Sequence, residues 1–185
     1  MRCKLRYKND MARFDVSDSA THQDGAALWS VYESVFGDHP DYETWRGAVW
    51  DKHRVRNGFR LARAYDGGAL VGFAYGYTGE HGQWWTDRAL AVLRPDVADE
   101  WLGGHFELVS IGVLDTARRG GVGRRLMHLL LEGLPHERQL LMTTADTTAP
   151  ARRLYASEGW RVLGPGIGNG TVIMGRRGTV GQETS

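Results

Sequence analysis

The sequence predicts a single domain of the α/β class, and two observations lead to that prediction. Its 185 residues fit one domain of ordinary size with a single hydrophobic core. Short segments with apolar alternation, typical of strands, are interleaved with segments whose apolar residues recur at helical spacing. Because no repeat or composition break divides the chain, one domain is expected over residues 1–176, followed by a disordered tail over residues 177–185.

Composition and charge exclude several classes of protein. Hydrophobic residues make up 42% of the chain and charged residues 24%, as in soluble globular proteins. The net charge of +1 is too small to indicate a nucleic-acid-binding protein. Cys3 is the only cysteine, so an intrachain disulfide is excluded. No apolar run approaches the roughly 20 residues of a membrane span, and no signal-peptide pattern opens the chain. We therefore expect a cytoplasmic protein that binds neither nucleic acid nor a membrane.

The N-terminal half contains both strand and helix patterns. Asp41 is a suitable N-cap for one helix, and Gly37 is a suitable stop for the helix before it. Asp66-Gly67-Gly68 lies between two alternating segments and predicts a hairpin turn. The elements predicted in this half are a strand over 2–8, a polar loop over 10–24, helices over 25–36 and 42–55, strands over 59–65 and 70–77, and a non-alternating excursion with one or two short helices over 79–104.

The C-terminal half alternates strands and helices more regularly. Leu126, Leu129 and Leu130 recur at helical spacing after an alternating run that ends at Val113. Pro150 suits the first turn of a helix. The elements predicted here are a strand over 106–113, a helix over 122–134, a strand over 139–144, a helix from 150 to a stop at Gly159, and strands over 160–163 and 171–175.

The glycine-rich turn at 118–123 predicts an anion-binding site. The first amides of a helix have no partners within the helix, its dipole places positive charge there, and glycines let a phosphate approach. A nucleotide-hydrolase loop would place Lys and Ser or Thr after the last glycine, where Arg124 and Arg125 stand. No dinucleotide-binding G-x-G-x-x-G opens a helix here. These residues alone leave the kind of phosphate open.

Two sequence blocks resemble one known family. The run V-x-x-x-x-R-x-x-G-x-G, from Val113 to Gly123, is similar to the acyl-coenzyme A signature of the GNAT N-acetyltransferase superfamily. The run A-x-x-L-Y-x-x-x-G-W, from Ala151 to Trp160, resembles that family's A-x-x-(L/F)-Y-x-x-x-G-F and follows at the right separation. The resemblance implies a mixed, mostly antiparallel sheet flanked by helices. It also implies a splay, for the pantetheine arm, between the strands that end near Val113 and Thr144.

The resemblance also implies which residues bind acetyl-CoA. Backbone amides of 119–124 would hold the pyrophosphate, and backbone groups of Ile111 and Val113 would pair with the pantetheine arm. The Val113 amide would polarise the thioester carbonyl. Thr148 stands where the family often has Asn. The coenzyme-binding residues expected in this way are Ile111, Gly112, Val113, Arg118, Arg119, Gly120, Gly121, Val122, Gly123, Arg124 and Thr148.

Two residues are expected to carry proton transfer. Tyr155 matches the family position whose hydroxyl can protonate the departing thiolate. Glu107 lies six residues before Val113, where some members of the family carry a general base. An alkylammonium has a pKa near 10.4 and must lose a proton before it attacks. Alternatively, Glu107 could be a strand-end carboxylate that pairs with an arginine, and Tyr155 could be a core tyrosine. The histidines lack metal-ligand spacing, so no metal site is expected.

The resemblance implies an N-acetyltransferase that moves acetyl from acetyl-CoA to a primary amine of a small molecule or peptide. Direct attack in a ternary complex is expected, because Cys3 is remote from both blocks. The acceptor face is expected between the first two helices and the excursion, where acidic residues suit a cationic amine and aromatic side chains form the walls. The acceptor-binding residues expected there are Tyr32, Phe36, Trp84 and Trp85.

Other interpretations remain at this point. Trp84 and Trp85 could be core residues of the excursion. The whole chain could be a non-catalytic module that senses acyl-CoA or docks a partner. Basic pairs such as Arg118-Arg119 and Arg152-Arg153 could contact nucleic acid, although the near-neutral charge argues against it. Dimers are common in the family that the chain resembles, so a homodimer is considered, without a predicted interface.

Overall fold

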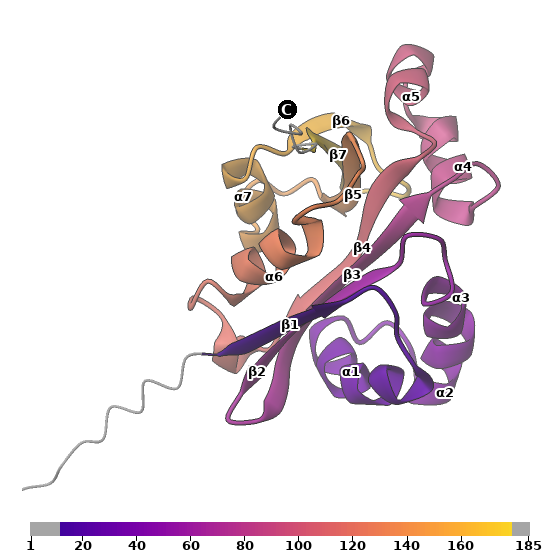
Figure 1. Ribbon diagram of the computed structural model, residues 1–185. Coiled ribbons are helices and arrows are strands. Elements are labelled where there is room, and N and C mark those ends of the chain that lie inside the picture. Colours follow the sequence, from indigo (N-terminus) through magenta and orange to yellow (C-terminus); the bar gives the residue numbers. More distant parts are fainter. Residues whose placement is uncertain (1–11, 179–185) are drawn as a thin grey trace, which may run out of the picture.

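A seven-stranded sheet in the order β1-β2-β3-β4-β5-β7-β6 runs through the molecule (Figure 1). The structure is a computed structural model that describes residues 12–178. The strands are β1 (Arg13–Ser17), β2 (Arg60–Asp66), β3 (Ala69–Gly79), β4 (His105–Val113), β5 (Arg138–Thr144), β6 (Arg161–Pro165) and β7 (Thr171–Arg177). Every neighbouring pair is antiparallel except β4 and β5, which are parallel. The predicted fold class, a mixed and mostly antiparallel sheet, is confirmed.

Helices cover both faces of this sheet. The helices α6 and α7 lie on one face, and α1–α5 lie on the other, with α4 and α5 beyond the far end of α1–α3 (Figure 1). None of the helices in the described part of the chain is long and apolar enough to cross a membrane. The helical elements are α1 (His22–Val35), α2 (Tyr42–Trp45), a π-helical turn (Arg46–Trp50), α3 (Asp51–His53), α4 (Trp84–Val92), α5 (Pro95–Trp101), a 3₁₀ turn (Asp115–Ala117), α6 (Val122–Leu131) and α7 (Pro150–Ser157).

Three apolar clusters hold the layers together. The largest packs one face of α6, including Leu126 and Leu130, against β2–β4 and α7. The second is aromatic and fills the space between α1–α3 and the strands β2 and β3. The third packs α4 and α5 against Leu140 and Ile173 on β5 and β7. Each half of the sheet therefore has its own helical cover on the α1–α5 face.

The start of the fold differs from the prediction. The strand predicted over 2–8 lies outside the described residues, and the polar segment predicted as a loop contains β1. Arg63 of β2 pairs with Asp15 of this edge strand at 2.7 Å and with Asp24 of α1 at 2.5 Å, so that a polar residue of the strand is balanced by a cation. Helix α1 begins earlier than predicted because Thr21 and Asp24 form a capping box. Paired charges and a cap, both polar, hid these elements from an apolar pattern.

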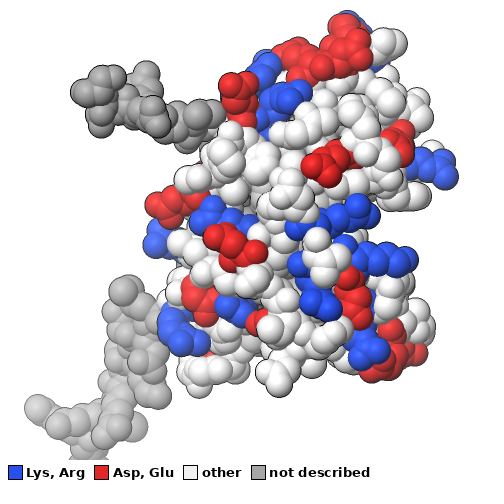
Figure 2. Space-filling view, turned by 45° about the vertical axis from the view of Figure 1, so that its right-hand side comes forward, with Lys and Arg blue, Asp and Glu red and all other residues white. Residues whose placement is uncertain are grey.

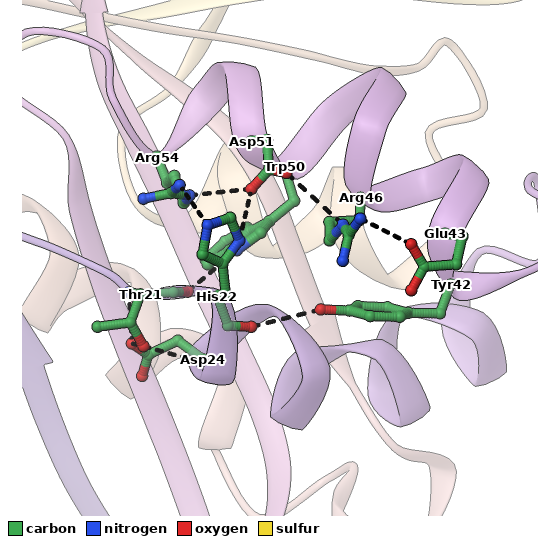
Figure 3. Close-up of polar contacts among 9 residues, drawn as sticks. All are labelled: Thr21, His22, Asp24, Tyr42, Glu43, Arg46, Trp50, Asp51 and Arg54. Carbon is green, nitrogen blue, oxygen red and sulfur yellow. Dashed lines mark hydrogen bonds and ion pairs between the residues drawn. The ribbon is translucent and has the colours of Figure 1, made fainter.

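The helix predicted over 42–55 is present but irregular. Asp41 caps it, accepting a hydrogen bond from the Thr44 amide at 2.8 Å, as predicted. The π-helical turn widens the helix, so that Trp45 and Trp50, five residues apart, both turn inward and stack with their ring centroids 5.7 Å apart. Polar contacts among Asp51, Arg54 and His22 tie this helix to the start of α1 (Figure 3).

The remaining predictions need smaller changes. The hairpin at Asp66–Gly68 joins β2 and β3, and the excursion over 79–104 contains the two short helices α4 and α5. Strand β7 ends at Arg177, one residue inside the predicted tail, and residues 179–185 lie outside the described part of the chain. The expected domain boundary stays a prediction.

Candidate active site

Strands β4 and β5 separate after two residue pairs. Their only register partners are Phe106 with Gln139 and Glu107 with Leu140, after which the strands diverge. A cavity of about 930 Å³ fills the side of this gap that α6 and α7 flank. The cavity is lined by Val35, Phe36, Ile111, Val113, Arg118, Arg119, Gly121, Val122, Gly123, Arg124, Ala149, Pro150, Ala151, Arg153, Leu154, Tyr155 and Ser157.

The edge of β4 presents free amides to this gap. The Leu114 amide donates to the Val71 carbonyl on β3 at 2.9 Å. Because successive backbone groups of a strand point to opposite edges, the amides of Val113 and Ile111 point away from β3 and toward the gap. Arg118 Nε donates to the Val113 carbonyl at 3.1 Å, so that carbonyl already has a partner. Gly112 lies instead beside the rings of Phe73 and Phe36.

The turn before α6 is shaped to bind an anion. Arg119 and Gly121 both have positive φ, 67° and 77°, so the turn aims its amides together in a way that extended backbone would not. Positive φ is uncommon for a residue such as Arg119, and backbone strain of this kind gathers at functional sites. The first amides of α6 have no partners within the helix. These amides and the N-terminal end of the helix dipole face the cavity.

Gly123 supports the same interpretation from a steric direction. A β-carbon added there would meet Leu154 at 3.7 Å and Val113 at 3.8 Å, which are ordinary van der Waals distances. The protein itself therefore has room for a side chain at Gly123. The absence of one leaves the amides of this turn open to a bound group in the cavity.

The arginines around the turn have different partners. Arg124 donates to Glu158 at 2.6 Å and to Ser157 at 3.2 Å, which joins α6 to the end of α7. Arg118 pairs with Asp115 at 2.6 Å. Arg119 and Arg153 line the cavity and have no carboxylate within 4.0 Å among residues 12–178. These two cations are therefore the ones available for phosphate.

Two positions around α7 differ from expectation. The sequence analysis named Arg153 only in a basic pair that could contact nucleic acid and not as a coenzyme ligand, although it lies two residues before Tyr155 in the second block and reaches the cavity. The Thr148 hydroxyl donates to Asp146 at 2.7 Å, and Thr148 is absent from the cavity lining, although Ala149 beside it is present. The structure thus brings Thr148 to the rim of the site with its hydroxyl already bonded.

Tyr155 lies in the wall of the cavity on α7. Its side chain is 5% exposed and packs against the Trp160 ring at a centroid distance of 6.1 Å. Burial raises the pKa of Tyr155 above the ordinary value for a phenol. The hydroxyl is therefore protonated at neutral pH and can donate a proton to a group in the cavity.

Glu107 lies on β4, the strand whose open edge borders the gap, but its side chain is on the face of the sheet opposite to α6 and α7. It stands opposite Tyr77 on β3 and is 3% exposed. One carboxyl oxygen, Oε2, has no hydrogen-bond partner among the described residues. Burial raises the pKa of Glu107 to about 8, and the charge of Arg56 opposes that rise. Glu107 is absent from the cavity lining and belongs to the face covered by α1–α3.

A polar group surrounds Glu107 that sequence reasoning missed. Tyr75 and Tyr77 lie on β3, and His53 ends α3. His53 Nδ1 lies 3.1 Å from the Tyr75 hydroxyl, and its ring centroid lies 5.2 Å from that of Tyr77. Burial is the main cause that lowers the pKa of His53 to about 4, so the imidazole is neutral. These side chains come from segments that are distant in sequence, and no local motif marks them.

The expected acceptor residues separate into two places. Phe36 is 41% exposed and lines the cavity, and Tyr32 lies buried next to it, with its hydroxyl 3.3 Å from Asp38. Trp85 packs in the cluster of α4 and α5. Trp84 is 64% exposed, with Arg88 over its ring. Neither tryptophan lines the cavity, so α1 contributes to this site and α4 does not.

Comparisons with known proteins agree with this geometry. A family model described as the Acetyltransferase (GNAT) family matches residues 25–160. A GCN5-like protein acetyltransferase of Mycobacterium tuberculosis is 30% identical over 158 residues, which cover 71% of this chain and 76% of that protein.

Solved structures share the fold at low identity. The ribosomal-protein-S18-alanine N-acetyltransferase of Escherichia coli superposes with a TM-score of 0.60 at 17% identity, over 94% of this chain and 99% of that one. The PaiA N-acetyltransferase of Thermoplasma acidophilum, solved in complex with coenzyme A, superposes with a TM-score of 0.58 at 12% identity, over 89% and 99%. The family model spans most of the chain, including both sequence blocks and the gap between β4 and β5, and the protein belongs to the acetyltransferase (GNAT) family.

Proposed function

We propose that this protein transfers an acetyl group from acetyl-CoA to a primary amine by direct attack in a ternary complex. The observation that carries the proposal is the continuous cavity between the open edge of β4 and the amides that begin α6. Relatives named as acetyltransferases and a fold neighbour bound to coenzyme A support it. One protein similar in sequence is a protein acetyltransferase and one similar in fold is an alanine N-acetyltransferase, which favours an amine as the acceptor.

Coenzyme binding uses mainly backbone groups. The amides of the turn Arg119–Gly123 hold the pyrophosphate, with Arg119 and Arg153 as the neighbouring cations. The pantetheine arm lies along β4 and bonds the amides that point into the gap. Because a strand advances about 3.3 Å per residue, Ile111 is nearer than Val113 to Glu107. We therefore assign the thioester carbonyl to the Ile111 amide, in place of the Val113 amide that the family resemblance implied, and the arm to Val113.

The acceptor enters from the α1 side of the gap and meets Glu107. Ordinary alkylammonium groups hold their proton up to a pKa near 10.4, so attack needs a base. A carboxyl with a pKa of about 8 is ionised in part near neutrality and takes up a proton more readily than an exposed glutamate would. The free Oε2 atom is the acceptor for that proton, received directly or through water.

The tetrahedral intermediate collapses with help from two groups on the coenzyme side. The β4 amide stabilises the oxyanion that forms from the thioester carbonyl. Tyr155, buried and protonated, donates its proton to the departing thiolate of coenzyme A, and the proton that the attached nitrogen then loses restores the Tyr155 hydroxyl through water. The products are an N-acetylated amine and free coenzyme A. No enzyme nucleophile takes part.

The test is thiol release from acetyl-CoA with a panel of primary amines, together with calorimetry of acetyl-CoA binding. We expect micromolar binding and acceptor-dependent release of thiol. Tight binding of acetyl-CoA without release for any amine would favour an acyl-CoA sensor. Failure to bind acetyl-CoA at all would overturn the proposed function.

A further inference from the structure

The segment between α3 and β2 is held firmly against the end of β3. The Asn57 carbonyl accepts from the Thr78 amide at 2.9 Å, one residue beyond Tyr77. Gly58 has a φ of +65°, and a β-carbon there would lie 2.3 Å from the Thr78 hydroxyl, so only glycine fits. The Arg56 amide donates to the His53 carbonyl at 3.0 Å. Arg56 is thus fixed beside the two strands that carry Tyr77 and Glu107.

The guanidinium of Arg56 forms no ion pair with a carboxylate of the described residues. Its Nε atom is buried without a hydrogen-bond partner, and no carboxylate lies within 4.0 Å of it among residues 12–178. The next arginines on either side differ, because Arg54 pairs with Asp51 at 3.0 Å and Arg60 with Asp18 at 3.4 Å. A half-buried cation with an unused donor is costly unless a bound group satisfies it.

Arg56 precedes Asn57, which is bonded to Thr78 beside Tyr77, and therefore lies within electrostatic range of the polar group at Glu107. Its charge contributes to lowering the pKa of His53. Burial raises the pKa values of Tyr77 and Glu107, and the charge of Arg56 opposes both increases. Figure 2 shows Lys and Arg side chains at mid-height on one face of the molecule, with Asp and Glu side chains among them. A cationic acceptor with no anionic group would bring a second positive charge toward Arg56.

We propose that Arg56 binds a carboxylate of the acceptor, so that the preferred acceptors are amino carboxylates in which an acid group lies close to the reacting amine. This inference rests on the acetyl transfer proposed above. Guanidinium and carboxylate match in shape and can form two parallel hydrogen bonds. One such pair neutralises the free charge of Arg56 and aligns the amine with Glu107.

The test uses pairs of acceptors that differ only in the carboxylate: lysine with cadaverine, phenylalanine with phenethylamine, and arginine with agmatine. We expect kcat/KM to favour the amino acid of at least one pair by about tenfold to a hundredfold, the gain typical of charge-assisted hydrogen bonds. Arg56→Gln should bring that ratio close to one, mainly through KM, and Arg56→Lys should keep part of it.

Arg54→Gln is the matched control, because Arg54 lies in the same segment and is already paired with Asp51. It should leave the ratio unchanged. A wild-type preference for the decarboxylated amines, or a ratio that survives in Arg56→Gln, would overturn the assignment. Calorimetry of lysine and cadaverine binding to the enzyme–coenzyme A complex, in the wild type and Arg56→Gln, decides the matter independently of turnover. A failure of acetyl transfer is thereby distinguished from a failure of carboxylate recognition.

Discussion

The two sides of the gap between β4 and β5 are built from different materials. The proposed coenzyme side consists mainly of backbone, namely the amides of Ile111 and Val113 and the positive-φ turn that precedes α6, with the side chains of Arg119, Arg153 and Tyr155 beside them. The acceptor side consists of side chains, with Glu107 and its neighbours drawn from α3, β3 and β4. Any sequence that adopts the same local backbone conformation can form the first side. The second side depends on which side chains the packing brings together.

This difference predicts how each side responds to substitution. A backbone site depends on glycines and on backbone conformation, so its specificity for the pyrophosphate and the pantetheine arm changes little when side chains change. A side-chain site can change its acceptor by single substitutions. Variants on the two sides should therefore fail in different measurements, coenzyme affinity on one and the rate or acceptor KM on the other.

The largest effect is expected for Gly121→Glu. The substitution places a carboxylate at the anion site and a side chain at a φ of 77°. Because like charges in contact cost several kcal/mol, the acetyl-CoA affinity should fall by about a hundredfold or more. Calorimetry measures it. Gly133→Glu, at a φ of 69° beyond the other end of α6, carries the same backbone strain away from the cavity and should bind acetyl-CoA normally. Unchanged acetyl-CoA affinity in Gly121→Glu would contradict the proposal that the amides of this turn bind the pyrophosphate.

Glu107→Gln tests the acceptor side and should leave acetyl-CoA affinity unchanged. Loss of a general base should lower kcat by about a hundredfold and remove the ascending limb of the pH–rate profile near pH 8. Glu80→Gln, an exposed carboxylate just after β3, is the control. An ascending limb that persists in Glu107→Gln would assign the base to another group or to water.

The same variant has a predicted stability effect with a definite sign. The folded protein keeps the Glu107 proton up to about pH 8, whereas the unfolded chain releases it near the ordinary pKa of 4.5. Stability from this group is therefore complete below pH 4.5 and decreases as the pH rises to about 8. At pH 9 the folded wild type must hold a buried charge that the amide does not carry, so Glu107→Gln should be more stable than the wild type in denaturant unfolding. Equal stability of the two proteins at pH 9 would indicate that Glu107 titrates normally.

Tyr155→Phe, a change to a side chain on the proposed coenzyme side, should have a smaller effect than Glu107→Gln. The variant keeps the packing against Trp160 and removes only the hydroxyl. We expect kcat to fall by about tenfold to a hundredfold with coenzyme affinity unchanged. Tyr65→Phe, at the far end of β2, should have no effect on the rate. A normal rate in Tyr155→Phe would make Tyr155 a packing residue.

The smallest effects mark the edge of the acceptor side. Phe36 and Trp84 are both exposed aromatic side chains, but only Phe36 lines the cavity. Phe36→Ala should raise the acceptor KM by about threefold to tenfold. Trp84→Ala should change KM less than twofold and the free energy of unfolding by no more than about 0.5 kcal/mol. Equal increases in KM for the two variants would extend the acceptor site to α4.

The sequence by itself determined the turn before α6, which lines the cavity, and most of the order of elements. An apolar alternation or a helical repeat is visible wherever one face of an element is buried, as in β4 and α6. The turn before α6 is visible because glycine is required where φ is positive or where a ligand approaches the backbone, as at Gly121 and Gly123. Local backbone conformation depends mainly on the residues of the same segment, so the sequence of that segment is enough to predict it.

Tertiary structure alone decided the rest. Strand β1 was missed because its polar residues are balanced by Arg63, which lies far along the chain. The separation of Trp84 from Phe36 follows from the packing of α4 against β5 and β7. The group of His53, Tyr75 and Tyr77 around Glu107, with Arg56 beside it, joins segments up to 54 residues apart (53 to 107) through strand register. Register and packing depend on contacts between distant segments, and no single stretch of sequence contains both partners of such a contact.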